Sequence, residues 1–104
     1  MSFKLLTRPK FKELVFKRDN YKCIVCKDIA VDAHHLLDRK LFRDGGYYLQ
    51  NGVSLCSDCH LKAEKGVYTP NELRRLARIE YVILPDGYCK KKEYNKWGKI
   101  IERY

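Results

Sequence analysis

The sequence has no long apolar run and none of the repetitive segments that mark fibrous or disordered proteins. No stretch approaches the roughly 20 apolar residues that a membrane helix needs. The opening residues, MSFKLLTRPKFKE, reach charged side chains before the apolar core of a signal peptide could form. There is no internal repeat, low-complexity tract or linker-like segment. We therefore expect residues 1–104 to form a single intracellular, cytoplasmic domain without a membrane partner.

A chain of 104 residues is too short to bury a large core. Domains of this size often need a disulfide or a metal ion to hold them together. Five cysteines are available, and four of them form two Cys-x-x-Cys pairs. Because thiols stay reduced inside the cell, we expect these pairs to bind a metal, with a disulfide framework as the weaker alternative.

Acidic residues are scarce relative to basic ones. The sequence has 22 Lys and Arg residues against 13 Asp and Glu residues, which gives a formal net charge of +9. Residues 1–20 carry six basic and two acidic side chains, and residues 85–104 carry six and three. This excess suits a polyanionic partner such as nucleic acid, although charge that only maintains solubility explains it equally well.

The spacing of apolar residues predicts short helices and strands in the first half of the chain. Residues 9–18 have the pattern of an amphipathic helix. Residues 30–35 alternate apolar and polar side chains like a strand, and 53–55 alternate into a second one. The segment 36–52 contains Asp-Gly-Gly and Asn-Gly turn signals, which predict a loop between the two strands.

The second half begins with two predicted helices. Residues 59–65 form the first, which Gly66 stops, and a capping box at 69–72 begins another that continues to Arg78. Residues 81–84 are expected to form a further strand before Pro-Asp-Gly, and the tail beyond them is basic and aromatic. Together the elements predict a small α+β domain.

The two Cys-x-x-Cys pairs carry the strongest motif in the chain. Zinc takes four thiolates in a tetrahedron, and each pair presents two from one tight turn. The predicted ligands are Cys23, Cys26, Cys56 and Cys59. Since 29 residues separate the two pairs, the zinc turns flank the predicted strand–loop–strand segment. Cys89 lies outside this pattern and is expected to be a free thiol.

All three histidines lie beside the zinc turns. His34 and His35 end the first predicted strand, where neighbouring side chains point to opposite faces. His60 follows a zinc ligand, and Glu64 lies one helical turn later on the same face. The side chains of His34, His60 and Glu64 could therefore bind one divalent cation and leave positions open, as in catalytic sites. Glu64 taken alone could equally be an ordinary solvated residue.

The order of these groups resembles the HNH endonuclease family, which has a ββα-metal core. It reads Cys-x-x-Cys, the pair His34-His35, Asn51, and then Cys-x-x-Cys-His ending at His60. Fifteen residues separate His35 from Asn51 and eight separate Asn51 from His60, in agreement with the family's spacing. The resemblance covers residues 8–66, a treble-clef-like core stapled by the four-cysteine zinc site and followed by a helix, a strand and a basic aromatic extension at 67–104.

The resemblance implies a role for each motif residue. His35 is expected to be the general base, and His34 and His60 to bind the divalent metal. Glu64 stands where some members have a further ligand. Asn51 either holds the loop that bears the base or approaches the metal. Asp32 is assigned no role, because we expect its side chain to point away from the pair.

These roles predict a metal-dependent endonuclease that nicks or cuts DNA, expected to be double-stranded, and leaves 5′-phosphate and 3′-hydroxyl ends. Zinc would be structural, while Mg²⁺ or Mn²⁺ would be catalytic, with Ni²⁺ or Zn²⁺ also suited to imidazole ligands. Residues 35–48 are also similar to phage-encoded members, which would place the protein in a host cell. The basic residues that could contact phosphates are Arg39, Arg43, Lys90, Lys91, Lys92 and Lys96.

Two alternatives keep the zinc site without catalysis. A zinc module that only binds nucleic acid would explain the cysteines and the charge, but it needs no histidines in this order. A treble-clef domain for protein interaction would explain the fold and leave the basic charge unused. The tail could likewise be a solvated segment whose aromatic side chains pack on the core. Either a monomer or a homodimer is compatible with the sequence.

Overall fold

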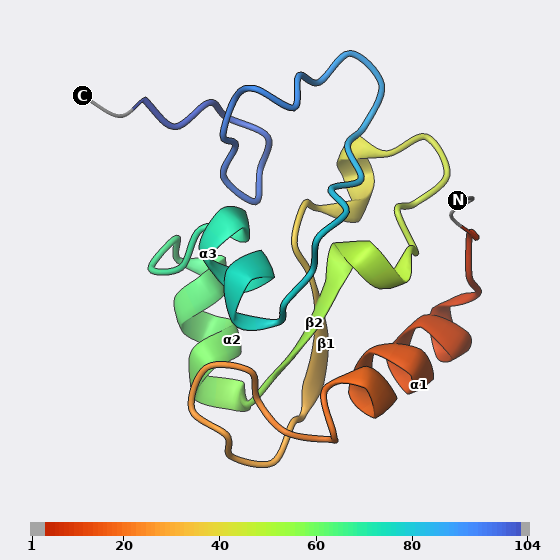
Figure 1. The fold of residues 1–104 in the computed structure, drawn as a ribbon, viewed down its shortest axis with the longest axis vertical. Coiled ribbons are helices and arrows are strands. Elements are labelled where there is room, and N and C mark those ends of the chain that lie inside the picture. Colours follow the sequence, from red (N-terminus) through yellow and green to blue (C-terminus); the bar gives the residue numbers. More distant parts are fainter. Residues whose placement is uncertain (1–3, 103–104) are drawn as a thin grey trace.

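The computed structural model of the chain describes residues 4–102, so the extreme ends of the predicted domain, 1–3 and 103–104, lie outside it. Within the described residues the fold is a small α+β domain (Figure 1). No helix in this range is long and apolar enough to cross a membrane. The elements in chain order are α1 (Arg8–Arg18), β1 (Asp32–His35), η1 (Arg39–Leu41), η2 (Leu49–Asn51), β2 (Gly52–Leu55), α2 (Ser57–Glu64) and α3 (Pro70–Leu76).

Helix α1 starts and ends where local chemistry dictates. The Thr7 hydroxyl accepts a hydrogen bond from the Lys10 backbone N–H at 3.3 Å, and Pro9 occupies the first turn, where no N–H is needed. Its inward side chains Phe11 and Val15 are buried. The helix ends at Arg18, as the sequence predicts.

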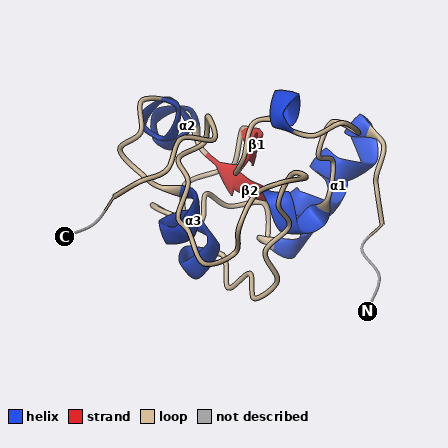
Figure 2. Ribbon diagram, turned by 90° about the horizontal axis from the view of Figure 1, so that it is seen from above, coloured by secondary structure: helices blue, strands red, loops and turns tan. Residues whose placement is uncertain are grey.

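Strands β1 and β2 form an antiparallel hairpin between α1 on one side and α2 on the other (Figure 2). In the register, His34 lies opposite Val53 and His35 lies opposite Gly52. A Cβ atom on Gly52 would lie 2.5 Å from Cζ of Phe11, so only glycine lets α1 approach β2 this closely.

The end of α1 is bound to β2 by a charged pair. Arg18 donates to the carbonyl oxygens of Leu49 at 2.9 Å and Gly52 at 2.7 Å. The adjacent Asp19 carboxylate accepts from the Ser54 backbone N–H at 2.9 Å. Because these bonds satisfy backbone groups at the strand edge, they fix the position of α1 on the hairpin.

Helices α2 and α3 close the other side of the core. Sγ of Cys56 accepts from the Cys59 backbone N–H at 3.4 Å and so caps α2. Thr69 and Glu72 form the predicted capping box of α3. The buried core beneath these helices consists of Cys23, Ile24, Leu36, Val53, Leu55, Cys56, Cys59, Ala63 and Leu73.

The structure corrects two predictions in the C-terminal part. Residues 81–84 are not a strand, because β1 and β2 pair only with each other in the described residues and leave no partner for a third ladder. Their apolar pattern reflects side-chain packing instead, since Val82 and Leu84 line a small cavity beside Arg74. Helix α3 ends at Leu76 rather than at Arg78, which has a left-handed φ of 58°.

The tail beyond residue 88 folds back on the domain. An isolated antiparallel bridge joins Tyr94 to Ile100. Between them, the Lys96 carbonyl accepts a hydrogen bond of 2.9 Å from the Asp38 backbone N–H. This contact brings the tail to the segment that follows β1, a placement that the sequence did not predict.

Candidate metal sites and cavity

The four predicted zinc ligands lie together. The Sγ atoms of Cys23, Cys26, Cys56 and Cys59 are within 4.8 Å of one another, and those of Cys26 and Cys56 are 3.5 Å apart. Four thiolates around zinc lie about 3.8 Å from each other, given Zn–S bonds of about 2.3 Å in a tetrahedron. The cluster therefore fits a metal ion such as zinc, and all five cysteines carry free thiols in the described structure.

The cysteine cluster is largely buried, and this favours a bound cation. Cys23, Cys56 and Cys59 are buried, and burial raises the pKa of Cys59 above its ordinary value. Deprotonated thiols in such surroundings need a positive charge beside them. Cys89 is exposed and lies outside the cluster, as expected.

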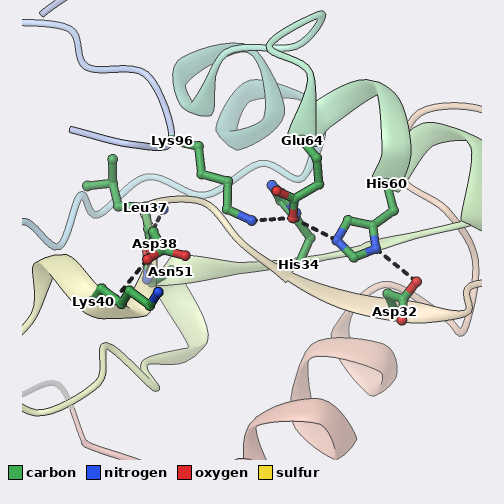
Figure 3. A network of polar contacts seen from close by, with 9 residues as sticks. All are labelled: Asp32, His34, Leu37, Asp38, Lys40, Asn51, His60, Glu64 and Lys96. Carbon is green, nitrogen blue, oxygen red and sulfur yellow. Dashed lines mark hydrogen bonds and ion pairs between the residues drawn. The ribbon is translucent and has the colours of Figure 1, made fainter. Parts of the chain in front are cut away.

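A second cluster joins β1 to α2. His34, His60 and Glu64 each offer a ligand atom, and these atoms lie within 4.8 Å of one another (Figure 3). Nε2 of His60 is 3.1 Å from Oε1 of Glu64, and Nδ1 of His34 is 3.8 Å from the same oxygen. The i, i+4 spacing on α2 brings His60 and Glu64 together, and the hairpin register adds His34.

The buried side chain of His34 indicates whether this cluster fits a metal ion. Its side chain is only 1% exposed, and within residues 4–102 its Nδ1 atom has no hydrogen-bond partner. Burial, followed by the positive charge of Lys96, lowers the pKa of His34 to about 2. A neutral imidazole nitrogen that is buried and unpaired is costly unless it binds a cation, so the residues fit a divalent ion.

Asp32 also belongs to this site, which corrects the expectation that its side chain points away. Its Oδ2 atom lies 2.9 Å from Nδ1 of His60, on the opposite side of the ring from Glu64 (Figure 3). A carboxylate in that place orients a metal-binding histidine. The signal was present in the sequence, because residues two apart on a strand, Asp32 and His34, share a face.

His35 occupies a separate environment. Its ring stacks on Phe11 with centroids 4.6 Å apart and meets Tyr47 edge-on at 4.9 Å. Among the described residues, its Nε2 atom has no hydrogen-bond partner. Burial, with a smaller contribution from Lys96, lowers the pKa of His35 to about 4. The ring is therefore held firmly and is neutral near pH 7.

Asn51 fixes the loop that follows His35. Its Oδ1 atom accepts from the Leu37 backbone N–H at 3.1 Å. Its Nδ2 atom donates to the carbonyls of Leu37 at 3.1 Å and Gly46 at 3.2 Å. The side chain is buried and engaged with backbone groups, so its geometry matches the positioning alternative rather than an approach to the metal.

The histidines open into one cavity of about 500 Å³. Its acidic lining residues are Asp32, Asp38 and Glu64, and its basic ones are Arg8, Lys12, Arg39 and Lys96. The cavity lining therefore carries charges of both signs, three acidic and four basic side chains.

The other predicted phosphate contacts do not share this cavity. Arg43 lines a smaller cavity with Asp44 and Tyr48. Lys90 and Lys92 lie beside the cavity near Arg74, and the intervening Lys91 is exposed. Of the six basic residues predicted from the sequence, Arg39 and Lys96 reach the histidine cavity.

One curated protein is similar in sequence to part of this chain. No protein-family model and no solved structure matches the chain. The chain is 33% identical over 60 residues to a curated protein, Anaredoxin from Nostoc sp. (strain PCC 7120 / SAG 25.82 / UTEX 2576). The match covers 55% of this chain and 75% of that protein.

Proposed function

We propose that the chain, which belongs to the same family as Anaredoxin, is a metal-dependent DNA endonuclease of the HNH type. One observation carries the proposal. The ligand atoms of His34, His60 and Glu64 gather within 4.8 Å, while His35 lines the same cavity with an unpaired ring nitrogen. A cation site beside a neutral imidazole supplies an electrophile and a general base, which suits phosphodiester hydrolysis.

His35 acts as the general base in this proposal. Its lowered pKa keeps the imidazole neutral, and stacking on Phe11 holds the ring in one orientation. The ring takes a proton from water as the oxygen of that water attacks phosphorus. The bond from phosphorus to the 3′-oxygen then breaks, which leaves a 5′-phosphate and, after protonation, a 3′-hydroxyl. Asn51 keeps the loop after His35 in register through its bonds to Leu37.

His34, His60 and Glu64 would hold the divalent ion, and Asp32 would orient His60. An ion such as Mg²⁺ or Mn²⁺, with Ni²⁺ or Zn²⁺ also suited to the histidines, would neutralise charge on the phosphate and the leaving oxygen. The cysteine cluster would hold a structural zinc ion that joins the turn before β1 to the start of α2.

Double-stranded DNA is the proposed substrate because the rim of the cavity is basic. Arg8 and Lys12 reach it from α1, and Arg39 reaches it from η1. These cations, which come from two different elements, would bind the phosphates that flank the scissile bond. A monomer would nick one strand, and cutting both strands would need two copies or two binding events.

The test compares wild-type protein with His35→Ala on supercoiled plasmid, first with Mg²⁺ and then with Mn²⁺. We expect the variant to cleave about 10²–10⁴-fold more slowly while its zinc content, fold and Mn²⁺ affinity stay unchanged. Equal cleavage by both proteins would remove His35 as the base. If neither protein cuts DNA with any divalent ion, a zinc module that only binds nucleic acid becomes the better explanation.

A redox role is the second candidate, because Anaredoxin has the name of a redox protein and four clustered thiolates also bind iron. The exposed position of Cys26 would give an electron partner access to such an ion. In this alternative the cysteine cluster would carry one electron by cycling between Fe³⁺ and Fe²⁺, and the histidine cavity would have no role.

Metal content separates the two candidates. Protein produced with both iron and zinc available is analysed for each element, and its visible spectrum is recorded before and after addition of dithionite. A coloured iron form that bleaches on reduction would support the electron carrier. Colourless protein with one zinc ion per chain would support the endonuclease.

A further inference from the structure

The C-terminal tail places a positive charge on the carboxylate of the second metal cluster. Nζ of Lys96 contacts Oε1 of Glu64 (Figure 3). This is the same oxygen that lies 3.1 Å from Nε2 of His60 and 3.8 Å from Nδ1 of His34. The ammonium group therefore occupies the carboxylate oxygen that a divalent cation would take.

A structured turn delivers this lysine. The Asn95 side chain accepts from the backbone N–H groups of Trp97 at 2.9 Å and Lys99 at 3.0 Å. The Asn95 backbone N–H donates to the Lys99 carbonyl at 2.8 Å, while the Lys96 carbonyl is bound by Asp38. Both the turn and its attachment to the domain thus fix the main chain at Lys96.

Burial shows that this ion pair differs from an ordinary surface pair. The side chain of Lys96 is only 11% exposed, whereas that of Glu64 is 33% exposed. An ammonium group removed from water needs an anion, and the Glu64 carboxylate is the anion that it contacts in this site. A pair that only attached the tail to α2 would not need to share its oxygen with two histidines inside the cavity.

We infer that Lys96 pairs with Glu64 in the metal-free protein and binds the scissile phosphate once a divalent ion has taken Glu64. Two cations cannot share one carboxylate oxygen without strong repulsion, so the incoming ion displaces the ammonium group. The main chain of Lys96 stays bound to Asp38, and its flexible side chain remains in the cavity that would receive the phosphate. This inference rests on the proposed function.

Metal binding provides the first test. Mn²⁺ is titrated by calorimetry into zinc-loaded wild type, Lys96→Met and the control Lys99→Met, which removes an exposed charge from the same turn. We expect Lys96→Met to bind Mn²⁺ about tenfold more tightly, because no charge-assisted hydrogen bond must be broken first. Lys99→Met should bind like wild type. Equal affinity in all three proteins would overturn the inference.

The site of binding is checked with Glu64→Gln. In that background, adding Lys96→Met should change the Mn²⁺ affinity much less than it does in wild type, since the ion pair is already lost. The same gain in both backgrounds would show that Lys96 does not act through Glu64 and would overturn the inference. If the wild type binds no Mn²⁺, or binds it as tightly as Glu64→Gln does, the proposed function fails instead.

Cleavage at saturating Mn²⁺ tests whether Lys96 binds the scissile phosphate once the metal ion is in place. Lys96→Met should lower the single-turnover rate about 10²-fold, because it removes a positive charge from the phosphate in the transition state. Lys96→Arg keeps the charge and should recover part of that rate, and Lys99→Met should cleave like wild type. A wild-type rate in Lys96→Met would overturn the inference. If Lys96→Met loses its zinc or its helical circular dichroism, Lys96→Gln replaces it in both measurements.

Discussion

Asp32 and His60, on different elements, face each other with Oδ2 and Nδ1 2.9 Å apart. Asp32 begins β1, and His60 lies in α2 immediately after a cysteine of the first cluster. The carboxylate leaves Nε2 of the ring directed to Glu64. One strand thus supplies both a candidate ligand, His34, and the residue that orients the ligand facing it.

Replacing Asp32 should weaken metal binding without touching a ligand. In Asp32→Asn the amide can still form a hydrogen bond, but it no longer polarises the His60 ring. We expect Mn²⁺ affinity, measured by calorimetry, to fall by about 10- to 100-fold, the usual effect of such a partner. Asp86→Asn removes an exposed carboxylate elsewhere and serves as the matched control. Unchanged affinity in Asp32→Asn would mean that the contact is only a surface ion pair.

Asn51→Ala should destabilise the fold and slow cleavage together. The substitution leaves the Leu37 N–H and the carbonyls of Leu37 and Gly46 without their buried partner. We expect a loss of about 3 kcal/mol in the free energy of unfolding, measured by urea denaturation. Gln50→Ala, at the preceding position, should cost far less. A stable Asn51→Ala protein that had lost Mn²⁺ binding would instead favour a role at the metal.

Removal of a cysteine ligand should unfold the domain. Cys59→Ser takes one thiolate from the buried cluster, and in a core this small the metal supplies much of the folding free energy. We expect loss of bound zinc by elemental analysis and loss of the cooperative thermal transition. Cys89→Ser, outside the cluster, should leave both unchanged. Well-folded wild-type protein without any metal would contradict the prediction.

DNA affinity should fall steeply with salt, because basic side chains release counterions from the phosphates that they contact. Alanine at Lys90, Lys91 and Lys92 should weaken binding and flatten the salt dependence, with metal content unchanged. Arg39 lines the histidine cavity, so we expect Arg39→Ala also to lower the rate at which bound DNA is cleaved. Fluorescence anisotropy between low and physiological salt measures the slope, and a flat response would exclude these contacts.

The sequence predicted the parts of the fold that depend on local spacing. Each Cys-x-x-Cys pair needs only one tight turn, and alternation across 30–35 is visible in the chain itself, of which 32–35 form β1. The capping box at Thr69 likewise acts over four residues and was confirmed. The strand expected at 81–84 was wrong because pairing depends on a partner elsewhere, and apolar residues alone do not supply one.

In the candidate site, too, the sequence predicted the contacts that depend on local spacing and missed those between distant segments. The gathering of His34, His60 and Glu64 follows from a register and a helical turn, so the motif order predicted it. Lys96 reaches the site through a contact 32 residues along the chain, and no local pattern distinguishes it from the other lysines of the tail. The stacking of His35 on Phe11 depends similarly on how α1 crosses the hairpin.

The missing side chain at Gly52 has a consequence for how this domain can vary. Any larger residue there would meet Phe11 and Val15, so α1 could stay in place only if both side chains were exchanged for something smaller. That exchange would take away the ring on which His35 rests. A substitution at position 52 would therefore be tolerated by the fold at the expense of the imidazole's alignment. Helix α1 and the hairpin must evolve as a pair, and in an engineered chimera they should be transplanted together.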